Sequence, residues 1–317
     1  MTDKKNKIQS NTEINNFFRL LIFIFFTLLF LFYPGDSFYV KFFSYHRQLF
    51  AGSVSELKYQ SNKVPYLNNP SWLPEISAIG AYVIDLDTAT PIFEKNSQRS
   101  FLPASTVKII TALTAVDYFK PDDILTVKKV ISEGQVIGLF RGEKLTFENL
   151  IYGLLIHSGN DAAYVIADNY PGGQKAFVEK MNQKAVELKM TKSQFKNPAG
   201  LDDFGQHTTP FDLSLAGRKL LKTPLLAKTV AIKSITISDV NFEHFHQLSN
   251  VNRLLGEVVG LGGIKTGYTE DAGENLVSFY KKNGHQFIIV ILKSDDRFTD
   301  TINVVNWIDG NVKYIEN

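Results

Sequence analysis

Leu102-Pro103-Ala104-Ser105-Thr106-Val107-Lys108 places a serine three residues before a lysine, at what the sequence predicts to be the start of a helix. Residues three apart share one face of a helix, so Ser105 and Lys108 should lie side by side. Proline suits a first helical turn, and the mainly apolar residues that follow, up to Pro121, predict a helix buried in the core. The N-terminus of such a helix favours an anion, and a neutral Lys108 can accept the hydroxyl proton of Ser105. The stretch therefore predicts a nucleophilic serine.

Two rarer motifs support this interpretation, because the S-x-x-K spacing alone is weak evidence. The same spacing occurs at three other places: Ser55/Lys58, Ser193/Lys196 and Ser278/Lys281. Ser158-Gly159-Asn160 is the only S-x-N in the chain, and Lys265-Thr266-Gly267 is the only K-T-G. A serine helix, then S-x-N, then K-T-G late in the chain is the pattern typical of the serine β-lactamases and penicillin-binding proteins, which this chain resembles.

The amino-acid composition excludes several classes of protein and several kinds of functional site. With 317 residues, 44% of them hydrophobic, the chain can bury a large core. A formal net charge of +2, without a basic block interleaved with aromatics, gives no indication of a nucleic-acid partner. The absence of cysteine excludes disulfides, thiolate nucleophiles and cysteine-ligated metals. His244 and His246 have a spacing that metals accept, but we interpret them as a polar strand face and expect no metal and no cofactor.

The N-terminal part of the sequence predicts a membrane anchor and a linker. Residues 1–16 are polar and carry three lysines, and residues 17–33 are apolar apart from Arg19 and Thr27. A cleaved signal peptide is the alternative, but no small-x-small cleavage site follows. The apolar run has about the minimum length for spanning a bilayer, and the lysines favour a cytoplasmic N-terminus. We therefore expect a cytoplasmic tail (1–16), a transmembrane signal anchor (17–33), a juxtamembrane linker (34–75) and a catalytic domain (76–317) outside the cell membrane.

Strands at both ends of the domain, with helices between them, predict an α+β fold. Period-two stretches predict strands at 78–85 and 91–94, and again after about residue 235. Asn283-Gly284, between predicted strands 272–281 and 285–293, is a strong β-hairpin signal. Helices are expected from residues 103, 146, 160, 173, 209 and 297 onward. We expect one antiparallel sheet, with strands from both ends of the domain, packed against a helical cluster.

Within this group, the chain resembles the D-alanyl-D-alanine carboxypeptidases, the low-molecular-mass penicillin-binding proteins that trim peptidoglycan stem peptides. The likeness covers about residues 76–309 and rests on five stretches, in order: Pro103–Lys108, Leu154–Ala163, Asn197–Asp202, Thr208–Leu213 and Gly263–Thr269. Many such enzymes continue into a second, β-rich domain and a C-terminal amphipathic anchor, whereas this sequence ends at Asn317. We therefore expect the N-terminal segment to provide the anchor.

The resemblance implies a role for each residue of the first two motifs. Ser105 would be the nucleophile that is acylated, and Lys108 its general base. Ser158 would pass a proton to the departing D-alanine, and Asn160 would bind an amide of the substrate. His157, although next to Ser158, is not expected to act with it, because adjacent side chains on an ordered backbone seldom point at each other.

The K-T-G strand would bind the end of the substrate. Lys265 and Thr266 would hold the terminal carboxylate, a charged contact that selects chain ends over internal peptide bonds. Gly267 and Tyr268 complete the substrate-binding set, and the backbone N–H groups of Ser105 and Tyr268 would form the oxyanion hole. Arg297, expected in a loop before the last helix, is either a second carboxylate partner or an ordinary surface or helix-capping arginine, and we favour the latter.

The implied substrate is a peptidoglycan stem peptide ending in D-alanyl-D-alanine, with β-lactam antibiotics as covalent inhibitors. Two alternatives stay open: a β-lactamase of the same fold and a non-catalytic wall-binding scaffold. A class A β-lactamase needs a glutamate in an E-x-x-x-N loop, and no glutamate between Asn160 and Lys265 has an asparagine four residues later. The presence of every signature residue argues against the scaffold. We interpret Asp161 and Asp212 as helix caps.

Overall fold

The computed structural model describes residues 17–29, 31–32 and 63–315. The chain separates into two units, residues 1–61 and 62–317. In the first unit, residues 17–29 form a helix whose large apolar side chains are exposed. Among the described residues, no helix is both long and apolar enough to cross a membrane. The expected tail 1–16, positions 30 and 33 of the expected anchor, and residues 34–62 of the expected linker lie outside the described residues.

A five-stranded antiparallel sheet with the order β3-β2-β10-β9-β8 forms the frame of the second unit. Its strands are β2 (Gly80–Asp85), β3 (Pro91–Lys95), β8 (Leu261–Thr269), β9 (Gly273–Lys282) and β10 (His285–Ser294). Asn283 and Gly284 join β9 to β10, and both have positive φ angles, 50° and 85°, as a tight two-residue hairpin requires. The expected sheet, built from both ends of the domain, is confirmed.

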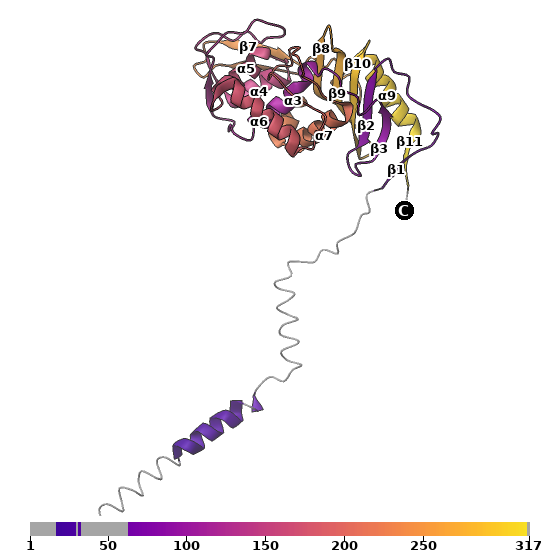
Figure 1. The fold of residues 1–317 in the computed structure, drawn as a ribbon. Coiled ribbons are helices and arrows are strands. Elements are labelled where there is room, and N and C mark those ends of the chain that lie inside the picture. The colour runs from indigo at the N-terminus through magenta and orange to yellow at the C-terminus, as the bar shows by residue number, and fades with distance from the viewer. Residues whose placement is uncertain (1–16, 30, 33–62, 316–317) are drawn as a thin grey trace, which may run out of the picture. The chain divides into compact units, whose positions relative to one another are not determined.

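The sheet lies between two layers of helix (Figure 1). One layer, the helical cluster, consists of α3 (Lys108–Ala115), α4 (Phe147–Leu155), α5 (Asn160–Asn169), α6 (Gly173–Glu187), α7 (Pro210–Leu221) and α8 (Pro224–Val230). The other layer is α9 (Arg297–Asn311). Because side chains alternate along a strand, β10 contributes to both cores: Ile288 and Val290 pack toward the helical cluster, and Ile289 and Ile291 pack toward α9.

The helix that carries the S-x-x-K motif begins differently from the expectation. Ala104–Val107 form a 3₁₀ turn, η1, which continues as α3 and ends at Ala115, well before Pro121. Two short antiparallel pairs accompany the helical cluster: β4 (Ile124–Thr126) with β5 (Lys144–Thr146), and β6 (Ser234–Ser238) with β7 (Phe245–Ser249).

Threonine side chains cap two helices, as the sequence predicts. The hydroxyl of Thr146 accepts a hydrogen bond from the Asn149 amide at 3.3 Å at the start of α4. The hydroxyl of Thr209 likewise accepts from the Asp212 amide at 3.0 Å at the start of α7. The interpretation of Asp212 as a cap is wrong, because its carboxylate accepts from the Lys192 amide and the Ser193 hydroxyl instead.

The folded unit begins before Ile76, where the sequence analysis placed its start. β1 (Pro65–Leu67) pairs with β11 (Val312–Tyr314), which directly follows α9. The carbonyl oxygen of Trp72 accepts a hydrogen bond of 2.6 Å from the indole N–H of Trp307, a buried residue of α9. Residues 65–75 therefore belong to the folded unit and pack on α9, and they are not a linker.

This boundary predicts different stabilities for two truncated chains. A chain of residues 62–317 should keep the stability of the folded unit, whereas a chain of residues 76–317 should lose about 2 kcal/mol or more of unfolding free energy. The shorter chain lacks the β1–β11 ladder and leaves the Trp307 N–H without its partner. Thermal or urea unfolding of both chains measures the difference.

Gly310→Ala provides an independent check in the full chain. In an ordinary helix this change is stabilising by about 1 kcal/mol. Here the new Cβ would lie 2.6 Å from the Trp72 ring, so we expect destabilisation. Equal stability of the two truncated chains, together with a stabilising Gly310→Ala, would restore Ile76 as the boundary.

Candidate active site

Ser105 is held against β8, the edge strand of the sheet. A Cβ atom on Gly267 would lie 2.9 Å from the Ser105 backbone nitrogen, so the strand and η1 can approach this closely only with glycine at position 267. From the neighbouring strand β9, the buried Asn275 amide donates to the carbonyl oxygens of Leu102 at 3.0 Å and Pro103 at 3.2 Å. Sheet contacts therefore set the position of the serine.

The side-chain amine of Lys108 is completely buried and contacts three oxygen atoms. Its Nζ lies 2.7 Å from the Ser105 hydroxyl, 2.7 Å from Asn160 Oδ1 and 2.6 Å from the Ala199 carbonyl oxygen. The amide and carbonyl oxygens can only accept hydrogen bonds, whereas a hydroxyl can also donate. A neutral amine with two N–H groups would satisfy both acceptors and leave its lone pair for the Ser105 hydroxyl.

The surroundings of Lys108 favour this neutral form. Burial lowers the pKa of Lys108 well below its ordinary value, and the positive charge of Lys265 lowers it further. Asp161 opposes these effects and raises the pKa, but burial has the largest influence. Lys265 is also buried, which, with the charge of Arg297, lowers its pKa to about 7.

The S-x-N motif forms the turn before α5. Ser158 is buried and has a φ of 65°, a left-handed conformation that is uncommon for serine. Asn160 is the first residue of α5; its side-chain NH₂ donates to the Glu133 carbonyl at 2.8 Å, and its backbone N–H donates to the Gln135 carbonyl at 2.7 Å. These two bonds orient Asn160 Oδ1 toward Lys108. His157 contacts the Gln135 side chain and not Ser158.

A segment before β5, residues 133–143, therefore supports the S-x-N turn. Asp161 is not the N-cap of α5, which is Gly159; it lies in the first turn and accepts there from the Ala162 N–H at 2.9 Å. Its carboxylate also accepts from the backbone N–H groups of Ile137, Gly138 and Leu139. At the other end of the segment, the buried Glu143 carboxylate lies 2.7 Å from Nε2 of His246 on β7.

The interpretation of His244 and His246 as a polar strand face is wrong for His246. Its imidazole is buried, and both ring nitrogens have partners: Nδ1 lies 3.2 Å from the Ile137 carbonyl, and Nε2 lies 2.7 Å from the Glu143 carboxylate. His244, just before β7, is exposed. The buried imidazole thus connects β7 to the middle of the supporting segment, at Ile137, and to its last residue, Glu143.

The Ala199 carbonyl is presented by a tight turn in the stretch Asn197–Asp202. Asn197 Oδ1 accepts hydrogen bonds from the backbone N–H groups of Ala199, Gly200 and Leu201. Gly200 has a φ of 89°, and a Cβ there would lie 2.0 Å from the Ala104 carbonyl oxygen. The turn can pack on η1 only with glycine at this position.

The K-T-G strand borders the same site. Lys265 Nζ donates to the Thr266 carbonyl at 2.9 Å, and both residues are buried, whereas Tyr268 is 60% exposed. Arg297 is the first residue of α9, and its guanidinium donates to the Gly267 carbonyl at 2.9 Å with only 11% of the side chain exposed. The favoured interpretation, an ordinary surface or helix-capping arginine, is therefore wrong: Asp296 caps α9, and Arg297 contributes a second cation beside β8.

The structure thus brings the three motifs together, with support that the sequence analysis did not assign. Hydrogen bonds join Ser105, Lys108 and Asn160. Close backbone packing adds Gly267, and the charge of Lys265 acts on Lys108. Asn275 and Glu143 were missed because neither lies in a recognisable motif. The Ala199 carbonyl lies in a stretch that carries the family likeness, but that stretch had no assigned role.

This fold and this meeting of S-x-x-K, S-x-N and K-T-G define the class of serine penicillin-binding proteins and β-lactamases. The solved structure of the Streptomyces K15 DD-transpeptidase superposes with a TM-score of 0.71 at 28% identity, covering 75% of this chain and 99% of that one. The D-alanyl-D-alanine carboxypeptidase DacD from Francisella tularensis gives a TM-score of 0.69 at 26% identity, covering 74% of this chain and 70% of that one.

Sequence comparison gives the family. A family model for D-alanyl-D-alanine carboxypeptidase matches residues 67–296, and the chain belongs to this family. The D-alanyl-D-alanine carboxypeptidase DacF of Bacillus subtilis is 33% identical over 221 residues, which are 68% of this chain and 57% of the relative. DacD of Escherichia coli is 29% identical over 251 residues, 75% of this chain and 63% of the relative. The chain thus spans less than two thirds of the length of these two curated relatives.

The supporting segment predicts that a residue remote from Ser105 affects acylation. His246→Ala would leave the Glu143 carboxylate buried without its imidazole partner, so we expect a loss of about 1–3 kcal/mol of unfolding free energy. Acylation by a fluorescent penicillin, measured where the variant is still folded, should also slow, because Asn160 depends on this segment.

His244→Ala is the matched control, because this histidine is exposed and two residues away. Its unfolding free energy should stay within about 1 kcal/mol of the parent chain. A His246→Ala variant with the parent's stability and acylation rate would refute a supporting role for this contact.

Proposed function

We propose that the chain is a serine-type D-alanyl-D-alanine carboxypeptidase that removes the terminal D-alanine from peptidoglycan stem peptides through an acyl-enzyme on Ser105. The observation that carries this proposal is the contact between Ser105 and a buried Lys108 whose other two neighbours can only accept hydrogen bonds. The names of the relatives and the family model support the same substrate class.

In the proposed mechanism, Lys108 is the general base. It receives the Ser105 proton as the hydroxyl oxygen attacks the carbonyl carbon of the penultimate D-alanine. The backbone N–H groups of Ser105 and Tyr268 bind the oxyanion. Ser158 passes a proton to the nitrogen of the departing D-alanine, and Asn160 also binds an amide of the substrate. Water then hydrolyses the ester on Ser105.

Lys265 and Thr266 bind the terminal carboxylate of the substrate. The lowered pKa of Lys265, about 7, means that the free enzyme holds this amine in both protonation states near neutral pH. An incoming carboxylate favours the charged form and offsets the effect of burial. Arg297, which is fixed to the Gly267 carbonyl, adds positive potential at the same end of the site.

β-Lactam antibiotics acylate the same serine and act as covalent inhibitors. No E-x-x-x-N glutamate is present between Asn160 and Lys265 to activate water against the penicilloyl ester, so its release is slow. The catalytic domain works outside the cell membrane, with residues 17–33 as the transmembrane signal anchor and residues 1–16 in the cytoplasm. The exposed apolar side chains of helix 17–29 support this location.

The decisive experiment compares two turnover rates on one purified sample. We expect many turnovers on a peptide ending in D-alanyl-D-alanine, with free D-alanine as product, and slow release of penicillin from the enzyme. Ser105→Ala should abolish both D-alanine release and covalent penicillin labelling while the domain stays folded. Rapid penicillin hydrolysis without D-alanine release would instead establish a β-lactamase.

A transpeptidase is a second outcome, because solved relatives of this fold bear that name. The same assay, run with an amine acceptor such as glycine, separates the two activities. Predominant formation of the acceptor peptide over the hydrolysed peptide would show that the acyl-enzyme is passed to amines and would overturn the carboxypeptidase proposal.

The role of Lys108 predicts a specific pH profile. Because its pKa is lowered, the neutral base persists at pH values where an ordinary lysine is charged. Acylation by penicillin should therefore fall about tenfold per pH unit below this lowered pKa and level off above it. Stopped-flow or quenched labelling across mildly acidic to alkaline pH measures the profile. A rate that does not change across this range would exclude Lys108 as the titrating base.

A further inference from the structure

A cluster of metal-ligating side chains lies at the opposite end of the sheet from the candidate active site. Its members are Asp85, the last residue of β2, Asp87 in the following turn, and His285, the first residue of β10. On β10, Ile291 lies six positions after His285, and its partner Leu276 is itself paired with Thr266. At about 3.3 Å per residue, the cluster is roughly 20 Å from the K-T-G motif along the strand direction.

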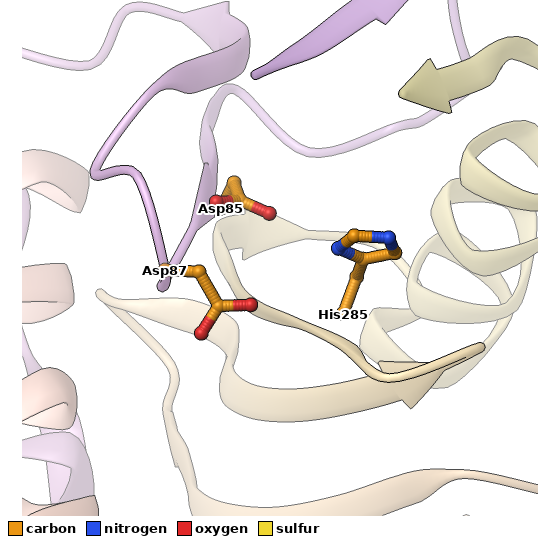
Figure 2. Close-up of side chains that lie close together, drawn as sticks. All are labelled: Asp85, Asp87 and His285. Carbon is orange, nitrogen blue, oxygen red and sulfur yellow. The ribbon is translucent and has the colours of Figure 1, made fainter. Parts of the chain in front are cut away.

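Strand register brings these three side chains to one place. Phe287 pairs with Asp85 across β10 and β2, and the Leu86 N–H donates to the Gln286 carbonyl at 2.8 Å. The side chains of Asp85 and His285 thus lie on one face of the sheet, and Asp87 follows in the adjoining turn. One ligand atom from each of the three residues lies within 4.8 Å of those of the other two. In Figure 2, one ring nitrogen of His285 points toward the side on which both carboxylates lie.

Two of the three ligands are already held in place by outer contacts. Asp85 Oδ1 accepts from the Thr88 backbone N–H at 2.8 Å and from the Thr88 hydroxyl at 2.7 Å. Asp85 Oδ2 accepts from the Tyr314 hydroxyl at 2.6 Å, and the Tyr314 ring stacks on His285 with a centroid distance of 3.3 Å. Metal-binding side chains are commonly oriented by such outer hydrogen bonds and packing.

Among the described residues, hydrogen bonds and no ion pair hold the carboxylate of Asp85. Asp85 has 0% exposure, yet none of the ion pairs of the described residues includes it. A buried carboxylate normally needs a compensating cation, and a bound metal would supply one.

The donor set selects the kind of metal. One imidazole nitrogen with two carboxylate oxygens suits zinc and similar divalent transition metals, whereas calcium and magnesium prefer oxygen ligands alone. Bonds of about 2.1 Å place ligand atoms about 3.4 Å apart around a tetrahedral ion, so modest closure of this cluster is sufficient. Asp87 is exposed, which leaves water access to a fourth position.

We propose that Asp85, Asp87 and His285 form a binding site for zinc or a similar divalent transition metal, which joins the β2–β3 turn to the start of β10. Through the Asp85–Tyr314 hydrogen bond, the bound ion also steadies β11 and its partner β1. The site is structural and separate from Ser105. Its ligands come from opposite ends of the domain, so no local sequence pattern indicates it.

Equilibrium dialysis of the chelator-treated full-length protein against zinc chloride tests the proposal. We expect one saturable zinc ion per chain and no comparable uptake of magnesium or calcium. Asp87→Asn and His285→Gln should each weaken zinc binding by about tenfold or more. Zinc should raise the melting temperature of the parent protein but not that of His285→Gln. Both variants should still be labelled by fluorescent penicillin, which shows that they are folded.

His244→Gln is the matched control, because the His244-x-His246 pair has a spacing that could also bind zinc. This variant should bind zinc like the parent. Zinc uptake that survives both Asp87→Asn and His285→Gln, the absence of saturable zinc binding, or preferential binding of calcium would each overturn the proposal. In these cases Asp85 would serve only to close its turn and hold Tyr314.

Discussion

The structure of this domain depends on a lysine side chain placed where no water can solvate it. Four parts of the chain meet at Lys108 Nζ: the start of α3, the 3₁₀ turn with Ser105, the start of α5 with Asn160, and the turn with Ala199. Oxygen atoms replace the solvent around the amine, so a shift of any of these parts would leave a buried polar group without a partner. The hydrogen bonds that offset the desolvation of the Lys108 amine also orient this amine toward the Ser105 hydroxyl.

Burial of the lysines has a cost in stability that the sheet has to offset. The pKa values of both Lys108 and Lys265 are lowered, so the folded state binds protons less readily than the unfolded state. Folding stability from these groups therefore declines as pH falls from the ordinary lysine range toward their lowered pKa values, and the penalty stays constant below them. Two cores, one on each face of a five-stranded sheet, provide the opposing hydrophobic stabilisation.

Local patterns made the main strands, the hairpin and the three motifs predictable from sequence. Asn283 and Gly284 both adopt positive φ angles, which these two residue types favour, so the hairpin turn is predictable from them alone. The alternation of side chains with a period of two indicates β9 and β10 without any information about the strands they pair with. The Ala199 contact was not predictable, because a backbone carbonyl carries no side-chain signal. His246 and Glu143 look like surface residues until β7 is packed against the segment before β5. β1 is too short to give a pattern, and its partner strand is at the other end of the domain.

The strand order has a consequence for how the protein is made. β2 and β3 emerge early from the ribosome, but β8, β9 and β10, which complete the sheet, lie after residue 260. A growing chain that already contains Ser105, Lys108 and Asn160 still lacks the strand against which η1 packs and the asparagine that holds Leu102 and Pro103. Pairing between such distant segments forms slowly. Nascent chains that end before residue 260 therefore carry Ser105, Lys108 and Asn160 without the supporting geometry, which forms only after β8 and β9 have been synthesised.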